Sequence, residues 1–270
     1  MMIYVTGSNG LIGTSLKEKI EIVPISYRDV EPELSFESCS TLIHLATSIT
    51  SRSSLNEIRE SFNSDVLIPL KIFRQFLTVN PYGRIIFLSS AGDLHSYNYE
   101  NEQPSTEKSV PVPKTLYGAH KLLVENHLNL LHLEFPNFTS LVFRVSNVYG
   151  AKVETSRVNG LVDKLISSED EIKIFADLDT TINLIHIDDL VNLLFLSLGK
   201  HMMPGHYTFL VGNESYKISD ILNLVSKNKK VKITVESAPK NYSYINLDCT
   251  NIKKFFNWSC KKSLLNLFEV

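Results

Sequence analysis

The sequence predicts an α/β fold in which a doubly wound parallel sheet is followed by a smaller C-terminal lobe. Short apolar runs alternate with longer segments of helical periodicity in the first half, as is typical of parallel strands joined by crossover helices. A glycine-rich turn follows the first apolar run, at residues 7–13. After residue 150 the expected strands are short and mixed with helices. We therefore place the domain boundary at residue 150 and expect residues 181–200 to return to the main sheet.

The individual elements follow from the spacing of apolar residues. In the first half we expect strands at residues 3–6, 22–25, 41–45, 84–88 and 140–145, and helices at 11–19, 55–77 and 117–135. Pro24 lacks a backbone donor and favours an irregular second strand. In the C-terminal part we expect strands at 173–175, 207–211 and 231–235, and helices at 188–198 and 218–226.

Composition excludes several classes of protein. A chain of 270 residues can bury a core without disulfides or structural metals. A net charge of −2 gives no electrostatic reason to expect a nucleic acid or a membrane as partner. No apolar run approaches the ~20 residues that span a bilayer, and no signal peptide is indicated. The three cysteines, Cys39, Cys249 and Cys260, form no metal motif, so we expect reduced thiols in a cytoplasmic protein.

The turn after the first strand has the spacing of a phosphate-binding loop. Glycine at this spacing lets the backbone turn tightly and approach a pyrophosphate, while the helix that follows offers unpaired N–H groups. We therefore expect a Rossmann-type dinucleotide site; a glycine-rich turn without a ligand is the alternative. Its expected cofactor-binding residues are Gly7, Ser8, Asn9, Gly10, Leu11, Ile12 and Gly13.

The choice between NAD and NADP depends on the end of the second strand. If that strand ends at residue 25 or 26, Arg28 faces the adenosine ribose and favours the phosphate of NADP. If the register slips, Asp29 favours NAD instead. A solvated pair without a cofactor role is the third possibility. NADP is slightly favoured.

Tyr117 and Lys121 are predicted to lie one helical turn apart on the same face. A nearby ammonium stabilises a phenolate, so we expect Lys121 to lower the pKa of Tyr117. Tyr117 would then exchange a proton with a substrate oxygen while hydride moves to or from a nicotinamide. Ser90 follows the strand at 84–88 and would hydrogen-bond the reacting oxygen; Ser89 takes this role if the register shifts by one. The catalytic residues are thus predicted to be Tyr117, Lys121 and Ser90.

Taken in order, these motifs resemble the extended short-chain dehydrogenases/reductases of the NAD-dependent epimerase/dehydratase family. The segment Thr6–Gly13 is similar to the family's TGxxGxxG loop, and His44-Leu45-Ala46-Thr47 to its HLAA segment, which lines the cofactor. The segment Arg144–Gly150 looks like RxxNxYGP, whose Asn reaches the substrate. The resemblance implies an NAD(P)-binding Rossmann domain at 1–150 and a substrate-binding lobe at 151–270.

The resemblance also implies site residues beyond the catalytic ones. The cofactor set gains Leu45, Ala46, Thr47 and Ser89, and also contains Tyr117 and Lys121. The substrate-binding residues would be Ser90, Ala91, Asn147 and Asn159. Relatives pair their two long helices into a homodimer, so a homodimer is expected here as well.

Four departures from the family pattern narrow the function. Ala91-Gly92 replace the acid pair of dehydratases, and Asp93-Leu94-His95 replace a V-Y-G segment. Ile182 stands where relatives carry an Arg that grips the substrate's diphosphate, with Lys240 or Arg157 as possible substitutes. Asp65 stands where many relatives carry Asn.

Three hypotheses follow from the sequence. The first is a reductase that transfers hydride from NAD(P)H to a keto group, most simply the 4-keto group of a nucleotide-linked deoxysugar. The second is a nucleotide-sugar 4-epimerase that retains its NAD tightly. The third is a non-catalytic dinucleotide-binding sensor or scaffold, motivated by the altered loop after Ser90 and the missing Arg.

Overall fold

The computed structural model describes residues 2–26, 35–38, 40–51, 53–96, 103–150, 160–168, 171–237 and 244–267 of the chain. Arg28, Asp29, Cys39, Arg157, Asn159 and Lys240 lie outside these residues, so the predictions made for them remain predictions. None of the helices described is both long and apolar enough to cross a membrane. Cys249 and Cys260 are free thiols.

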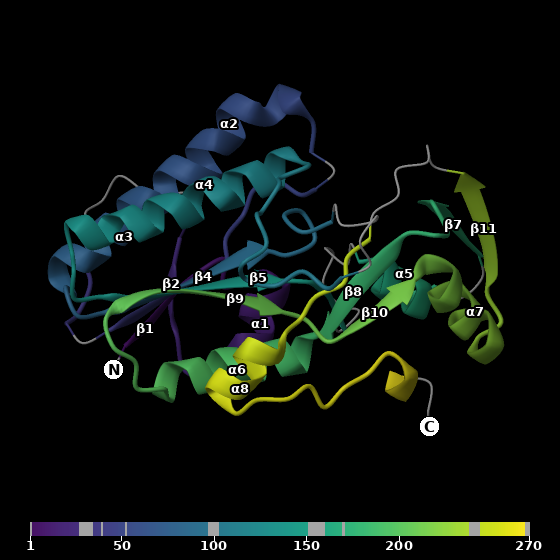
Figure 1. Cartoon of the computed structure of the whole chain (residues 1–270). Helices are drawn as coiled ribbons and strands as arrows, with labels where there is room; N and C mark the ends of the chain where they lie inside the picture. Colours follow the sequence, from purple (N-terminus) through teal and green to yellow (C-terminus); the bar gives the residue numbers. More distant parts are fainter. Residues whose placement is uncertain are drawn as a thin grey trace.

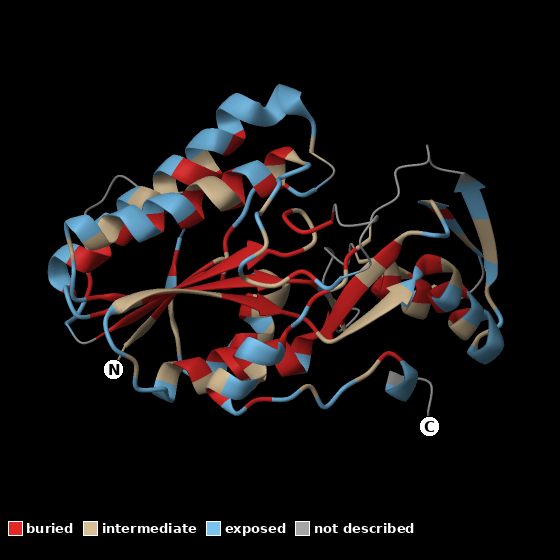
Figure 2. Ribbon diagram, in the orientation of Figure 1, coloured by how far each residue is buried: buried red, intermediate tan, exposed pale blue. Residues whose placement is uncertain are grey.

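Six parallel strands form the central sheet, in the order β2-β1-β3-β4-β5-β9. Their bounds are Ile3–Thr6 (β1), Val23–Ile25 (β2), Thr41–His44 (β3), Arg84–Ser90 (β4), Thr139–Val145 (β5) and Gly205–Val211 (β9). The predicted α/β fold class is confirmed, with a doubly wound, Rossmann-like sheet. The strands of this sheet are largely buried (Figure 2), which explains their nearly continuous apolar sequences.

Helices cover both faces of the sheet (Figure 1). One face carries α3 and α4, and the other carries α1, α6 and α8. The bounds are Leu11–Lys17 (α1), Ile68–Val79 (α3), Leu116–Leu130 (α4), Ile187–Gly199 (α6) and Thr250–Phe256 (α8). Neighbouring strand residues point to opposite faces: Tyr4 and Leu42 face α3, whereas Val5 and Ile43 face α6. Two apolar cores therefore sandwich the sheet.

The helical stretch predicted at 55–77 is observed at 55–79, but it is not uniform. It begins with a 3-10 turn, Leu55–Glu57 (η1), capped reciprocally by Ser54 and Glu57. The stretch continues as α2 (Ile58–Phe62), widens into a π-helical turn at Asn63–Leu67 (η2) and ends as α3. Single π turns are frequent at functional sites, and this one carries Asp65.

The C-terminal part forms a lobe beside the carboxyl ends of the central strands (Figure 1). It contains a three-stranded sheet, β10-β8-β6, and a two-stranded sheet, β11-β7. The strands are Asn147–Tyr149 (β6), Glu171–Ala176 (β7), Thr181–His186 (β8), Glu214–Lys217 (β10) and Lys232–Ser237 (β11), and the helices are Leu161–Ser167 (α5) and Ile218–Asn228 (α7). A third apolar cluster joins these elements.

Five elements were not predicted: β6, β8, β10, α5 and α8. The strands β6 and β10 have only three and four residues, too few for a clear period of two. Short 3-10 turns also occur at Leu131–Leu133 (η3) and Leu265–Leu267 (η4). Within the segment 181–200, β8 belongs to the lobe, whereas α6 packs against α1 beneath the central sheet.

Candidate active site

The two strands on either side of the sheet's switch point deliver the glycine loop and the 45–47 segment. The strand β1 pairs with β2 on one side and with β3 on the other. Successive strands are therefore added on opposite sides of β1, and the switch point lies between β1 and β3. Ligands of open α/β sheets bind beyond the carboxyl ends of strands at such a point. Gly7 follows β1 and Leu45 follows β3, which places these two predicted cofactor segments side by side.

The glycine loop lies so close to its neighbours that side chains cannot be accommodated. Gly7 has φ +68°, and a Cβ there would lie 2.6 Å from the backbone N of Ala46. A Cβ on Gly13 would lie 2.6 Å from the carbonyl oxygen of Gly7, because the first turn of α1 rests on the loop. Real Cβ atoms do not approach other atoms this closely, so both glycines are required by the local packing.

The start of α1 provides a cradle of suitable chemistry for a pyrophosphate. Gly10 is the N-cap of α1, and no side chain caps the helix there. Within 4 Å, a Cβ built on Gly10 would meet one atom, the carbonyl oxygen of Gly7 at 3.2 Å. Leu11 and Ile12 supply the first backbone N–H groups of the helix. The residues present therefore fit a dinucleotide, whose phosphates these N–H groups can receive.

Two predicted loop residues have other contacts. Asn9 accepts a hydrogen bond from the Lys17 ammonium through Oδ1 at 2.7 Å, on the outer side of the loop. Ser8 is buried.

Thr6 and His44 fasten β1 to β3 at the switch point. The Thr6 hydroxyl lies 2.8 Å from Nδ1 of His44 and also accepts the backbone N–H of Ala46 at 3.4 Å. Burial, together with the Lys121 ammonium, holds the pKa of His44 well below its usual range. His44 is therefore neutral near pH 7 and serves as a structural support for the segment 45–47. Ala46 is buried, Leu45 half-buried and Thr47 exposed.

Asp65 organises the loop that follows β3, a role the sequence reasoning did not assign. Its carboxylate accepts the backbone N–H of Ser48 at 2.7 Å and of Ile49 at 3.3 Å, and the hydroxyl of Thr47 at 3.1 Å. An amide side chain has one accepting oxygen, whereas the carboxylate has two, and both are used here. The replacement of the family's Asn by Asp thus has a structural consequence.

Lys121 lies under the site and is almost completely buried. Its ammonium donates a hydrogen bond to the carbonyl oxygen of Leu88 at 2.9 Å and lies 5.4 Å from the centre of the Tyr117 ring. Burial lowers the pKa of Lys121 to about 8, although the carboxylates of Asp65 and Glu125 act in the opposite direction. The spacing argument for a shared helix face is confirmed by this contact.

The predicted effect on Tyr117 is wrong. Burial raises the pKa of the Tyr117 phenol, and the carboxylates of Asp93 and Asp65 raise it further. Lys121 is the neighbour that the helix spacing reveals, whereas the two carboxylates belong to other elements of the fold. Tyr117 is therefore a protonated phenol near neutral pH.

Ser90, at the end of β4, is engaged by a residue of the altered loop. Its hydroxyl donates to Oδ2 of Asp93 at 3.0 Å and accepts the backbone N–H of Asp93 at 3.2 Å. The other carboxylate oxygen of Asp93 accepts the hydroxyl of Thr115 at 2.7 Å. The alternative candidate, Ser89, is buried, and its hydroxyl has no hydrogen-bond partner among the described residues. Of the two serines, Ser90 is the one next to Asp93.

A buried ionic network supports this loop from below. Glu125, one turn after Lys121, accepts hydrogen bonds from Nε and Nη2 of Arg144, the shortest at 2.7 Å. Nη1 of Arg144 lies 3.1 Å from Nε2 of His95. Burial and the Arg144 guanidinium lower the pKa of His95 to about 4, so His95 accepts this hydrogen bond as a neutral ring. The network joins α4, β5 and the loop after β4.

The predicted substrate residues are placed differently from one another. Asn147 is exposed, and its amide lies 3.9 Å from the position of a Cβ on Gly92, next to the loop after Ser90. Ala91 is fully buried in the core, so a direct contact with substrate would require this packing to change. Ile182 pairs with Tyr216 in the lobe and packs between two apolar clusters. Ile182 therefore contributes to the packing of the lobe.

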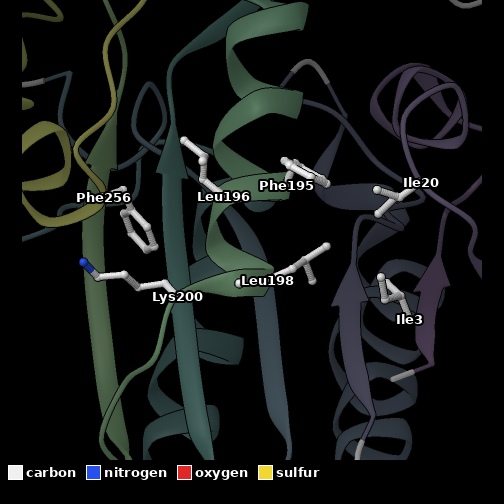
Figure 3. A pocket seen from close by; sticks show the side chains of 8 residues that line it. Ile3, Ile20, Phe195, Leu196, Leu198, Lys200 and Phe256 are labelled. Atoms are coloured by element: carbon white, nitrogen blue, oxygen red, sulfur yellow. The ribbon is translucent and has the colours of Figure 1, made fainter.

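An apolar pocket of the described residues lies away from this chemistry. It has a volume of about 570 Å³ and is lined mainly by apolar side chains, which include Ile3 at the start of β1, Leu198 at the end of α6 and Phe256 at the end of α8, with Lys200 at its edge (Figure 3). These residues lie at the amino ends of the strands, opposite the edge that carries the glycine loop. The pocket therefore has no part in the candidate active site.

Comparisons with known proteins agree with this geometry. A family model described as the NAD dependent epimerase/dehydratase family matches residues 23–212, a range that begins after the glycine loop. The structure of UDP-glucose 4-epimerase from Thermotoga maritima superposes with a TM-score of 0.81 at 20% identity, covering 99% of this chain and 97% of that one. UDP-glucuronic acid 4-epimerase from Bacillus cereus gives 0.78 at 18% identity, covering 100% and 97%.

A third solved structure, RMD from Pseudomonas aeruginosa complexed with NADPH, gives a TM-score of 0.77 at 16% identity and covers 98% of this chain and 95% of that one. At these identities the likeness shows a shared fold. Comparison with curated protein sequences gives no match.

Proposed function

Because the chain belongs to the NAD-dependent epimerase/dehydratase family, we propose that it is an NAD(P)-dependent reductase acting on a keto group of a sugar, most simply the 4-keto group of a nucleotide-linked deoxysugar. The observation that carries this proposal is the arrangement of polar groups around Tyr117. Its phenol lies beside the buried Lys121 ammonium, near the start of a helix whose N-cap, Thr115, is joined to Ser90 through Asp93.

When bound, a reduced nicotinamide would supply the hydride that the carbonyl carbon receives in the proposed reaction. Tyr117 gives its proton to the carbonyl oxygen, so that the ketone becomes an alcohol and the charge that develops on oxygen is neutralised. The Lys121 ammonium, at 5.4 Å from the ring centre, stabilises the phenolate left behind. Ser90 orients the oxygen toward Tyr117. The glycine loop holds the cofactor's phosphates at the start of α1.

We propose the following roles for the site residues in a complex with cofactor and substrate. Tyr117, Lys121 and Ser90 are catalytic, the loop 7–13 with residues 45–47 and Ser89 binds the cofactor, and Asn147 contacts the substrate. Arg28 as a selector of NADP and Asn159 as a contact to the nucleotide complete the proposal. The cofactor is NADP or NAD: of the similar structures, that of RMD holds NADPH and that of the B. cereus epimerase holds NAD.

The nature of the substrate rests on the solved structures. The T. maritima enzyme was solved with UDP-glucose and the B. cereus enzyme with UDP-glucuronic acid. Both are 4-epimerases, which makes a nucleotide-sugar 4-epimerase with tightly held NAD the second candidate function. Both functions use the same tyrosine, lysine and serine, so cofactor retention separates them.

The test is to purify the protein without added nucleotide, denature it, and identify any nucleotide released. A reductase should be empty or exchange its cofactor freely, bind NADPH more tightly than NADH, and reduce a nucleotide-linked 4-ketosugar. Near-stoichiometric NAD(H) would instead support the epimerase. Tyr117→Phe should abolish turnover and spare cofactor binding. A protein that neither releases nor binds either cofactor would overturn both functions.

We also propose a homodimer through the long helices. Apolar side chains are exposed along them, and Figure 2 shows that much of α2 is exposed. They include Leu55, Ile58, Leu67, Leu130 and Leu133. Pairing this face with the same face of a second copy would bury them. Ile58→Glu should convert a dimer into a monomer in analytical ultracentrifugation, and Leu178→Glu, an exposed position on the lobe, should not.

A further inference from the structure

Asp93 connects the two elements that carry the proposed catalytic groups. One carboxylate oxygen accepts the hydroxyl of Ser90 at the end of β4, at 3.0 Å. The other accepts the hydroxyl of Thr115, at 2.7 Å. Thr115 is the N-cap of α4 and in turn accepts the backbone N–H of Gly118 at 3.0 Å. A continuous chain of hydrogen bonds therefore runs from Ser90 to the first turn of the helix that contains Tyr117.

The backbone around Asp93 is fitted to the same helix. Its carbonyl oxygen accepts the backbone N–H of Lys114 at 3.3 Å. A Cβ on Gly118, the residue after Tyr117, would lie 2.9 Å from the Cβ of Asp93 and 3.0 Å from its carbonyl oxygen. Any side chain at position 118 would thus push Asp93 away. The contact between the loop and the helix is direct, and it is closest beside Tyr117.

The Ser90 hydroxyl has two of its hydrogen-bonding capacities in use. It donates its hydrogen to Asp93 and accepts the backbone N–H of Asp93. A hydroxyl oxygen has two lone pairs, so one acceptor position is left and the position of Oγ is fixed. A ketone oxygen requires a donor. Ser90 can donate to the ketone only by turning its hydrogen away from the Asp93 carboxylate. The carboxylate then still accepts its other hydrogen bond, from the hydroxyl of Thr115.

We propose that Asp93 is a positioning residue: its carboxylate fixes the Ser90 hydroxyl relative to the Tyr117 helix and acts on the reaction through both of them. This rests on the proposed hydride transfer. It also assigns a role to the segment Asp93-Leu94-His95, in which the sequence departs from its relatives. Asp93 does not contact the reacting atoms.

The first test is a double-mutant cycle on kcat for ketosugar reduction. Asp93→Ala should lower kcat by about tenfold to a hundredfold, the range expected when a catalytic group is displaced by up to about 1 Å. In a Ser90→Ala background the same change should cost less than about threefold, because the hydroxyl that Asp93 holds is already gone. Equal losses in both backgrounds would overturn the proposal.

Thr115 offers a matched pair of variants if Asp93→Ala folds poorly. Thr115→Ser keeps the hydroxyl that reaches Asp93 and should retain near-normal kcat. Thr115→Val has almost the same shape without the hydroxyl, and should lower kcat in the same direction as Asp93→Ala. A Thr115→Val enzyme with unchanged kcat would contradict the proposed chain of hydrogen bonds.

A second readout does not depend on turnover. The charged groups that face Tyr117 are Asp93 from the loop after β4, Asp65 from η2, and Lys121 from its own helix, while His44 on β3 is neutral. Removing the Asp93 charge should lower the pKa of Tyr117, because that carboxylate raises it. The ¹³Cζ resonance of labelled tyrosine, assigned with Tyr117→Phe, reports this in wild type and Asp93→Asn.

The two readouts separate the failure of this proposal from that of the function. A wild-type protein that reduces no ketosugar, but whose Tyr117 titration shifts in Asp93→Asn, would overturn the function and keep the Asp93–Tyr117 coupling. An active enzyme whose Asp93 variants show neither the kinetic coupling nor the shifted titration would keep the function and overturn this proposal.

Discussion

The buried pair Glu125–Arg144 provides the sharpest test of the energetics beneath the site. Both side chains are under 10% exposed and are joined by three hydrogen bonds of 2.7–3.2 Å. Glu125→Ala leaves the Arg144 guanidinium charged in the interior, with the neutral His95 ring still in contact with it. Removing one partner of a buried ion pair costs about 3–5 kcal/mol, because a desolvated charge is left uncompensated.

The expected thermal effect follows from the size of the chain. For 270 residues, each kcal/mol of lost stability lowers Tm by about 2 °C, so Glu125→Ala should lower Tm by about 6–10 °C. Urea unfolding followed by circular dichroism gives the free energy directly. The surface pair Arg74–Glu134 is the matched control: its N–O distance is also 2.7 Å, but its side chains are 65% and 46% exposed. Arg74→Ala should change stability by less than about 1 kcal/mol.

A double variant separates the charge from the packing. Glu125→Ala with Arg144→Met removes both charges and should recover part of the stability lost in Glu125→Ala alone. If Glu125→Ala costs no more than Arg74→Ala, or if the double variant is less stable by the sum of the two single changes, the reasoning from an uncompensated buried charge is refuted.

Three further predictions concern other groups of the site. Gly7→Ala should weaken NADPH binding, measured by fluorescence, at least about tenfold, because the new Cβ would lie 2.6 Å from the backbone N of Ala46. Gly199→Ala is the control and should bind NADPH normally, because a Cβ there meets nothing within 4 Å. Equal affinities of the two variants would contradict the close approach at Gly7. The kcat of the reductase should fall above about pH 8 as the Lys121 ammonium loses its proton, and Lys121→Arg should move that fall to higher pH; a profile that does not change would exclude Lys121 as its source. The pKa of His95 is about 6.5 in the unfolded chain and about 4 in the folded protein. The free energy of unfolding should therefore fall by about 3 kcal/mol as the pH drops from about 6.5 to 4. Urea titrations of His95→Asn should show a correspondingly smaller fall.

The parts of the fold that the sequence predicted are those encoded by local patterns. The glycine loop, the buried strands and the helix that carries Tyr117 and Lys121 are each encoded within a few consecutive residues, and each is found close to its expected bounds. The Tyr117–Lys121 proximity follows from helix geometry alone. Of the lobe strands, β7 and β11 were predicted, whereas β6, β8 and β10 were missed. β6 and β10 are short, and β6 and β8 pair with each other across a long stretch of sequence.

The error about Tyr117 has the same origin. Its neighbour Lys121 is visible in the sequence, whereas Asp65 reaches it from another helix and Asp93 from a loop. The role of Asp93 depends on a hydroxyl 22 residues away, and that of Arg144 on partners 19 and 49 residues away. A signal was present in the sequence, since Asp65 and Asp93 both lie at departures from the family pattern. The physical meaning of those departures required the contacts.

The two proposed functions place different demands on Tyr117, which gives a further test between them. An epimerase must use its tyrosine first as a base, which takes the proton of a substrate hydroxyl, and then as an acid. A reductase uses it once, as an acid. Burial and the carboxylates of Asp93 and Asp65 raise the pKa of Tyr117, which disfavours the phenolate that would begin an epimerisation. The protonated phenol, however, readily gives its proton to a developing alkoxide, which is a much stronger base. We therefore expect ketone reduction at pH 7 to exceed alcohol oxidation, and the difference to narrow as pH rises toward the ionisation of Tyr117. Equal rates in the two directions at pH 7 would indicate that a bound cofactor reverses this bias, and would favour the epimerase.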